Sequence, residues 1–258
     1  MMFDGRGRAR ICASLLLACA IGWGLLLVQR DTTLVRHDHA IHTGAMRPAH
    51  PPTLTMNALA SLAAGWVLML TAMMAPALIQ PIHHLCSRSF RRRRARAALL
   101  FVAAYATIWL VVGGGLLAAG LGISSSAPSS VLPPVLGVLI ALLWQCSPAK
   151  QRCLNRCHAH PELAAFGTAA DLDSLRFGAT HGTWCAGSCW ALMLLPVLVP
   201  GEHLVTMAAV TLLVFSERLE GPRVPRWGLH GFGKVTRIVV AQSRMRLQGM
   251  TTVGAART

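Results

Sequence analysis

Sulfur-bearing side chains recur at helical spacing in two apolar stretches of this chain. The first stretch carries Met69, Met73 and Met74, and the second carries Cys185, Cys189 and Met193. A spacing of four residues places side chains on one face of an α-helix. Thioether and thiolate ligands favour Cu(I) over hard cations, so both faces are candidate copper sites. The alternative is that Met and Cys serve only to pack the helices, as apolar side chains do.

The composition predicts the class of protein that must position these sulfurs. Hydrophobic residues make up 54% of the chain and charged residues only 13%, which predicts an integral membrane protein. We expect an all-α fold with about six transmembrane helices, at residues 11–28, 57–82, 97–120, 131–146, 177–199 and 203–215. The first follows several arginines, as in a signal peptide, but it lacks a small-residue cleavage site and is expected to be a retained helix.

The positive charge predicts the orientation. The net charge is +15, but the arginines fall between and after the apolar runs, which is typical of membrane topology and not of nucleic-acid binding. Both termini and the loops 83–96 and 147–176 are therefore expected in the cytoplasm. The chain divides into an N-terminal helix with an outer loop (1–56), a metal-binding membrane domain (57–220) and a basic cytoplasmic tail (221–258). Anionic lipid is the expected partner of the tail.

Two loops contain further candidate ligands. The outer segment 29–56 carries His37, His39, His42, Met46 and His50, which would capture copper or zinc, or else form a solvated loop without a metal role. In the inner loop, Cys153 and Cys157 are spaced to lie one turn apart on a short helix, beside His158. Two alternatives remain open for these cysteines: they contact a metal ion, or they are an inert pair of thiols.

Histidines extend both patterns within the apolar stretches. His181 lies one turn before Cys185, and an ionisable residue inside a span is a functional hypothesis by default. His203 and Met207 repeat the spacing of four near the outer end of the last span. At ~1.5 Å per residue, the methionines of the second span and the cysteines of the fifth lie at matching depth. Gly178 and Gly182 would let neighbouring helices approach closely.

Three motifs in order give a family resemblance over about residues 57–220. They are Trp66-x-x-Met69-x-x-x-Met73-Met74-x-Pro76, then Gln145-x-x-Pro148-x-Lys150-x-x-Cys153-x-x-x-Cys157, then the run from Gly178 through His181, Cys185 and Cys189 to Met193, with Glu217-Arg218 after them. Together they resemble the DUF2182-type predicted metal-binding integral membrane proteins. That family is similar to membrane copper-delivery (copper chaperone) proteins associated with tyrosinase.

The resemblance implies a six-helix protein of the bacterial inner membrane that binds Cu(I) and passes it to a copper-dependent oxidase. The metal ligands that follow from the motifs and the spacings are Met69, Met73, Met74, Cys185, Cys189, Met193, His181, Cys153, Cys157, His203 and Met207. Two positions depart from the family pattern. Ser188 stands where a third cysteine is expected, and His203 stands where a methionine is usual. Imidazole selects Cu(I) less strongly than a thioether, so metal identity stays open.

Two other functions remain as alternatives. A membrane thiol–disulfide oxidoreductase typically uses Cys-x-x-Cys, whereas both pairs here are Cys-x-x-x-Cys. A structural or accessory membrane subunit would use the same sulfurs only for packing. The chain contains no phosphate-binding glycine loop, no His-Glu-x-x-His motif and no Gly-x-Ser-x-Gly motif, and only nine acidic residues. We therefore do not expect an enzyme.

Overall fold

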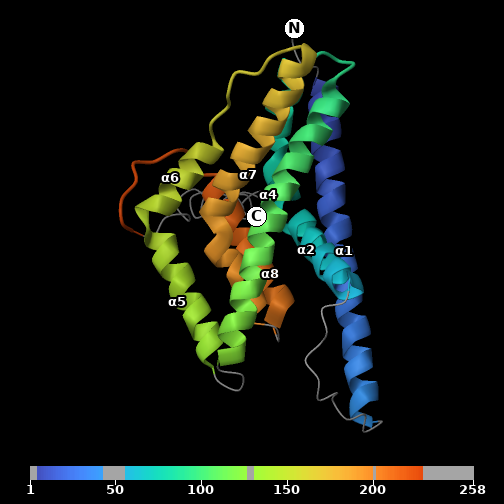
Figure 1. The fold of residues 1–258 in the computed structure, drawn as a ribbon, viewed down its shortest axis with the longest axis vertical. Helices are drawn as coiled ribbons and strands as arrows, with labels where there is room; N and C mark the ends of the chain where they lie inside the picture. The colour runs from blue at the N-terminus through green and yellow to red at the C-terminus, as the bar shows by residue number, and fades with distance from the viewer. Residues whose placement is uncertain (1–4, 43–55, 127–130, 200–201, 229–258) are drawn as a thin grey trace, which may run out of the picture.

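The computed structural model describes residues 5–42, 56–126, 131–199 and 202–228, and within these ranges the chain is helical and has no β-strand (Figure 1). The all-α prediction is confirmed. In chain order the elements are α1 (Gly5–His42), α2 (Met56–Met74), the short 3-10 helix η1 (Ala75–Leu78), α3 (Ile79–Arg88), α4 (Arg94–Ser126), α5 (Leu132–Cys146), α6 (Pro148–Cys157), α7 (Gly167–Leu198) and α8 (His203–Arg218).

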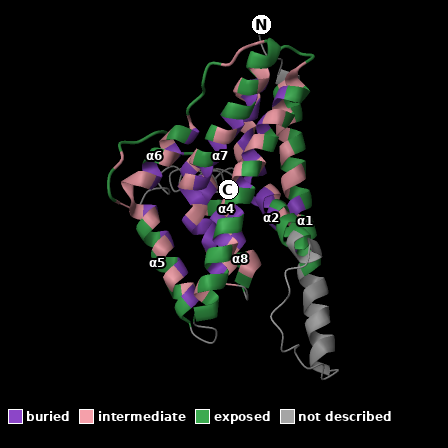
Figure 2. Ribbon diagram, viewed as in Figure 1, coloured by how far each residue is buried: buried purple, intermediate pink, exposed green. Residues whose placement is uncertain are grey.

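Helix α7 lies at the centre of the bundle. It packs against α4, α5, α6 and α8, whereas α1 packs against α2, η1 and α3 at one side. Buried residues are concentrated on α7 and on the faces turned toward it, and the outer faces of α4 and α5 are exposed (Figure 2). The candidate ligands of the fifth predicted span are therefore on the most enclosed helix.

Close packing of α4 against α7 depends on glycine. A Cβ atom on Gly178 would collide with the carbonyl oxygen of Phe101, and one on Gly182 would lie 3.2 Å from Cβ of Ile108. Both glycines thus allow the two backbones to approach, as their spacing predicts. This contact brings Tyr105 of α4 next to the cysteines of α7.

Three stretches are long and apolar enough to cross a membrane: Gly7–Gln29, Ala60–Arg88 and Arg94–Ser126. Helices α5 and α6, bent by 68° at their junction, qualify together as a fourth. Helix α8 has 16 residues, and α7 carries polar side chains such as His181 and Ser188 that are buried inside the bundle. A helix enclosed by protein does not need the hydropathy of a lipid-facing helix.

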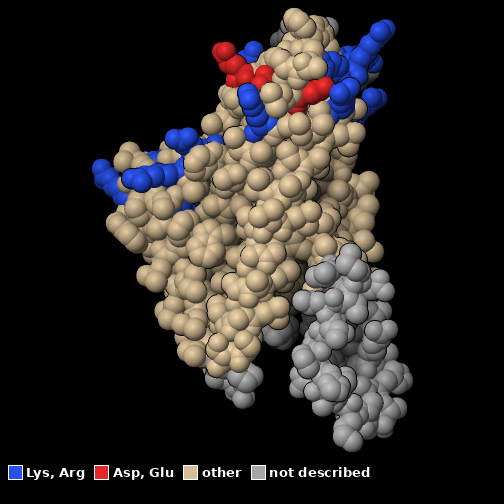
Figure 3. Space-filling model, in the orientation of Figure 1, with Lys and Arg blue, Asp and Glu red and all other residues tan. Residues whose placement is uncertain are grey.

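The outer surface of the bundle is apolar where it is not charged. Leu99, Val111, Leu121, Leu143 and Leu212 are each about 70% exposed, which is unusual for large side chains of a protein surrounded by water. Lysine and arginine gather toward one end of the described surface, and the middle of the molecule has almost none (Figure 3). This distribution is the one expected of a protein with a lipid-facing belt.

Several helices extend beyond or interrupt the predicted spans. The first candidate span ends at Gln29, one residue after the predicted end, but helix α1 itself continues to His42. The second predicted span is broken after Met74 by η1, where Pro76 lies in the first turn, because proline lacks the N–H that would continue the helix. Helix α7 begins at Gly167, ten residues before the predicted span, so its first turns belong to what was expected to be the inner loop.

The predicted short inner helix is present as α6. The side chain of Ser147 accepts a hydrogen bond from the backbone N–H of Lys150 and caps the helix, and Pro148 occupies its first turn. After α8 the chain runs back along α6. There the Asn155 side chain bonds both the N–H and the carbonyl of Arg223, and Gly228 N–H bonds Cys146 O at 3.1 Å. This segment of the predicted tail is therefore attached to the bundle.

Candidate metal centre

The sulfur atoms of both predicted ladders lie in the core. All of the relevant side chains belong to one contiguous buried cluster, and several are completely inaccessible to solvent. The members are Met69, Met73, Met74, Cys157, Cys185, Cys189, Met193 and Met207. Helix α2, which carries the first ladder, and α7, which carries the second, both contact α4 and α8. The fold thus collects soft donor atoms from four helices in a dry interior, an environment that suits Cu(I).

Cys185 has the most polar surroundings of these side chains. Its sulfur lies 2.9 Å from Nη2 of Arg218 and 3.3 Å from the hydroxyl of Tyr105. Its carbonyl oxygen accepts hydrogen bonds from Ser188 Oγ at 2.7 Å and from Cys189 Sγ at 3.2 Å. A guanidinium and a phenol beside a buried sulfur stabilise its thiolate form, which is the form that binds metal.

Helix α6 brings Cys157 to the same guanidinium. Nη2 of Arg218 is 3.9 Å from Cys157 Sγ, so the sulfurs of Cys157 and Cys185 flank one nitrogen atom. Cys153, one turn earlier, lies against α7 at Gly187, where an added Cβ would be 2.9 Å from its sulfur. Cys157 therefore lies beside the cysteines of α7. From the sequence it had been assigned to an inner loop with no fixed relation to α7.

The histidines differ in how they are held. His158 bonds Leu154 O and Arg218 O through its two ring nitrogens. His160 packs edge-on against His84, with ring centroids 4.8 Å apart, and burial followed by the proximity of His84 lowers the pKa of His160. His181 is buried among the rings of Phe101, Tyr105 and Phe177. Its Nε2 has no hydrogen-bond partner in the structure.

Two cavities meet this group of residues. One has a volume of about 260 Å³ and is lined by Gln80, Cys157, His160, His181 and Arg218, among others. A second, of about 220 Å³, is lined by His160 and His181 together with Arg156 and Trp184. His160 and His181 thus separate two spaces, and one of those spaces reaches Cys157 and Arg218.

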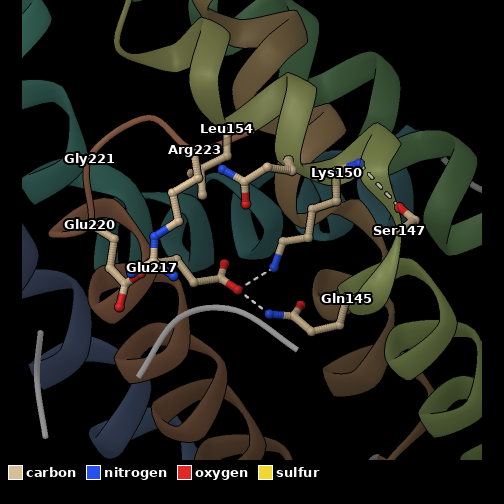
Figure 4. A pocket seen from close by; sticks show the side chains of 9 residues that line it. Gln145, Ser147, Lys150, Leu154, Glu217, Glu220, Gly221 and Arg223 are labelled. Carbon is tan, nitrogen blue, oxygen red and sulfur yellow. Dashed lines mark hydrogen bonds and ion pairs between the residues drawn. The ribbon is translucent and has the colours of Figure 1, made fainter. Parts of the chain in front are cut away.

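A buried ionic network fixes the end of α8. Glu217 pairs with Lys150 of α6 and accepts a hydrogen bond from the Gln145 amide of α5 (Figure 4). The side chains of Lys150 and Glu217 are only 4% and 5% exposed. Removing one partner from such a pair leaves an uncompensated buried charge, so the network holds α5, α6 and α8 in register. Glu217 and Arg218 are adjacent, so this network also sets the position of the guanidinium at the cysteines.

Other predicted ligands lie apart from Cys157, Cys185 and Cys189, the cysteine group around Arg218. His203 is half-buried in the first turn of α8, and Met207 is buried one turn later. Arg218 ends the same helix, so His203 and the cysteine group lie at opposite ends of α8. His37, His39 and His42 fall in the last turns of α1, where side chains lie outside the described residues, as do Met46 and His50 altogether.

Sequence reasoning missed the polar partners of the cysteines. Arg218 and Tyr105 were not predicted to contact Cys185, and the buried network around Glu217 was not predicted either. The Gln145, Lys150 and Glu217 motif residues were the available signal, since charged residues beside apolar spans are rarely buried without partners. Within the described ranges, no three side chains of His, Cys, Asp or Glu converge closely enough to hold a metal ion. A metal site with three ligands from this part of the chain therefore needs methionine ligands or a rearrangement of the cysteines.

Comparison with known proteins identifies the family. The family model PpoB2, described as a copper chaperone, matches residues 63–239. The matched region includes α2 from its third turn, the described helices that follow it, and every cysteine of the group around Arg218. Neither the curated proteins nor the solved structures gave a significant match. Since the match spans more than half of the chain, the protein belongs to the PpoB2 copper chaperone family.

Proposed function

We propose that this protein is an integral membrane chaperone that holds Cu(I) through methionine and cysteine sulfurs and delivers it to a copper-dependent oxidase. The observation that carries the proposal is that thioethers and thiols from α2, α6, α7 and α8 all belong to the one buried core cluster. Membership of a copper chaperone family makes copper the expected cargo. Thioether and thiolate donors favour Cu(I) over hard cations.

The proposed ligands are the two sulfur ladders. Cys185 and Cys189 would supply thiolates, and Met69 and Met73 would supply thioethers from α2. Met74, Met193 and Met207 would complete the set as the ion moves. Since Cys185 is already beside a guanidinium at 2.9 Å, it is the thiol best prepared to bind as a thiolate. Binding should release protons and weaken in acid, as for any thiolate site.

The proposed topology has six crossings with both termini in the cytoplasm. Helix α1, the broken α2–α3 pair, α4 and the bent α5–α6 pair supply the candidate spans, and α7 and α8 would supply the other two. The concentration of basic side chains at one end of the molecule supports this orientation (Figure 3). Helix α6, with Cys153 and Cys157, would then lie on the cytoplasmic side. His203 and the histidines of segment 29–56 would exchange copper on the outer side.

Copper X-ray absorption on the purified protein tests the proposed donors. After loading with Cu(I) under reducing conditions, the edge should be that of Cu(I), and the first shell should contain sulfur only. A first shell dominated by nitrogen or oxygen would contradict sulfur ligation and would indicate that histidines hold the copper. The Cys86→Ser variant is the matched control, because Cys86 is a buried cysteine on α3 in the same core cluster that is not among the proposed ligands. Its spectrum should equal that of the unmodified protein.

A further inference from the structure

The cysteine group around Arg218 includes Cys157, which does not belong to the second sulfur ladder. Cys157 comes from α6 and Cys185 from α7, and both sulfurs lie beside the same guanidinium nitrogen, at 3.9 Å and 2.9 Å. The described side-chain partners of Arg218 are sulfur atoms, and its Nε has no partner. The neighbouring carboxylate of Glu217 is already paired with Lys150. The charge of Arg218 is therefore directed at the two thiols.

This pairing has a simple electrostatic consequence for copper. A Cu(I) ion held by two thiolates has a net negative charge, and a net charge in a buried site is strongly disfavoured. A fixed guanidinium beside both sulfurs makes the assembly neutral overall. Both contacts come from Nη2 of a rigid, planar guanidinium, which fixes the charge beside the two sulfurs, whereas the ammonium of lysine sits at the end of a flexible chain. The position of Arg218 thus suits a two-thiolate metal site specifically.

The same group opens onto a cavity. Cys157, His181 and Arg218 line the space of about 260 Å³ between η1, α3, α6 and α8. His181 is only 4% exposed, and its Nε2 is unpartnered. An orphaned imidazole nitrogen on the wall of a cavity is available to a ligand that enters it. Cys157 lines this cavity, whereas Cys185 and the core methionines do not, so Cys157 is the first sulfur that a ligand in the cavity meets.

We propose that Cys157 and Cys185 form a second, two-thiolate Cu(I) position, neutralised by Arg218, through which copper passes between the cavity and the buried sulfur cluster. This inference rests on the proposed function. Copper stays Cu(I) throughout. As the ion moves inward, the bond to Cys157 breaks and a bond to Cys189 forms on the other side of Cys185. Cys189 gives up a proton and Cys157 takes one, so no oxidant or reductant is needed. His181 stands beside the path as a transient ligand.

The rate of copper exchange tests this passage. The full-length protein in detergent is loaded with Cu(I), and release to the chelator bathocuproine disulfonate is followed by absorbance. Cys157→Ser should slow both loading and release by about tenfold or more, the scale on which supporting contacts act at metal sites. Its copper content at equilibrium should remain close to that of the unmodified protein. Cys86→Ser is the matched control, because Cys86 is a buried cysteine on α3 that neither lines the cavity nor belongs to the proposed ligands, and this variant should exchange at the normal rate.

The outcomes separate this inference from the proposed function. Equal exchange rates in Cys157→Ser and Cys86→Ser, with normal copper content, would overturn the passage and leave the core site intact. An unmodified protein that retains no copper would overturn both proposals. A fall in thermal stability of Cys157→Ser beyond that of Cys86→Ser would identify a folding defect. In that case Cys157→Ala, which removes the thiol without adding a hydroxyl, must reproduce the slow exchange for the inference to stand.

Arg218 provides an independent test of the charge argument. Arg218→Gln removes the charge and should weaken Cu(I) binding by about tenfold to a hundredfold in competition with the chelator. Arg218→Lys keeps the charge and should recover part of the loss. A purely structural role would predict that lysine, whose side chain differs in shape from that of arginine, is no better than glutamine. Equal affinities for the two variants would contradict the assignment of Arg218 as the counter-charge.

Discussion

The close packing of α4 against α7 leads to a specific prediction about the helices that position the candidate metal site. Gly178 faces the carbonyl oxygen of Phe101 so closely that an added methyl group would overlap it. The obstacle is backbone and not the end of a flexible side chain, so Gly178→Ala must push the two helices apart. Overpacking of this kind costs about 1–3 kcal/mol. For a chain of this size, that corresponds to a fall in Tm of roughly 3–10 °C.

The same displacement should reach the metal site. Cys185 lies two turns after Gly178 on α7, and Tyr105 of α4 contacts its sulfur at 3.3 Å. Separating the helices lengthens this contact, so Gly178→Ala should also make the Cys185 thiol react faster with a maleimide. Thermal unfolding in detergent and the alkylation rate measure the two effects.

Gly115→Ala is the matched control for this prediction. Gly115 is on α4, and an added Cβ there meets nothing within 4 Å. Alanine favours the helix by up to about 1 kcal/mol over glycine, so the Tm of this variant should stay equal or rise. A Gly178→Ala variant as stable as Gly115→Ala would refute the close approach of α4 and α7 at this point.

Three further predictions concern the buried polar and sulfur groups. Lys150→Met leaves the Glu217 carboxylate buried without its cation and should lower the free energy of unfolding by about 3–5 kcal/mol, measured as a fall in Tm. The double variant Lys150→Met/Glu217→Met should recover most of the lost stability. Met69→Leu/Met73→Leu keeps the side-chain volume and should change stability by less than about 1.5 kcal/mol, yet it should lower copper retention in a chelator competition. If copper retention is normal in this variant, the two methionines only pack the core. Ser188→Cys adds a thiol next to Cys185 and should slow copper release to the chelator; an unchanged rate would argue against Cys185 as a ligand.

Periodicity predicted the parts of this fold that depend on local sequence. The apolar runs located α2, α4, α5, α7 and α8, and the cysteine spacing located α6. The boundaries were less predictable, because the first turns of α7 are polar and hydropathy does not include them in a span. The break after Met74 follows from Pro76, but its consequence, a turn from α2 into α3, depends on how both segments pack.

The candidate site was only partly accessible from the sequence. The sulfur ladders were identified because their members recur four residues apart on one helix, with Met74 next to Met73. The contacts of Cys185 with Tyr105 and Arg218 join residues 80 and 33 positions apart, and the Lys150–Glu217 pair joins residues 67 apart. No local pattern encodes such contacts. They depend on how α4, α6 and α8 are arranged around α7.

Copper content is the most direct measurement of the central claim. The protein is expressed with added copper, purified in detergent and compared with Cys185→Ser/Cys189→Ser and with the control Cys86→Ser by elemental analysis. The account predicts near-stoichiometric copper in the unmodified protein and the control, and its loss from the double variant. Equal copper in all three well-folded preparations would contradict ligation by the α7 cysteines. No copper in any of them would leave the buried sulfurs with a packing role alone.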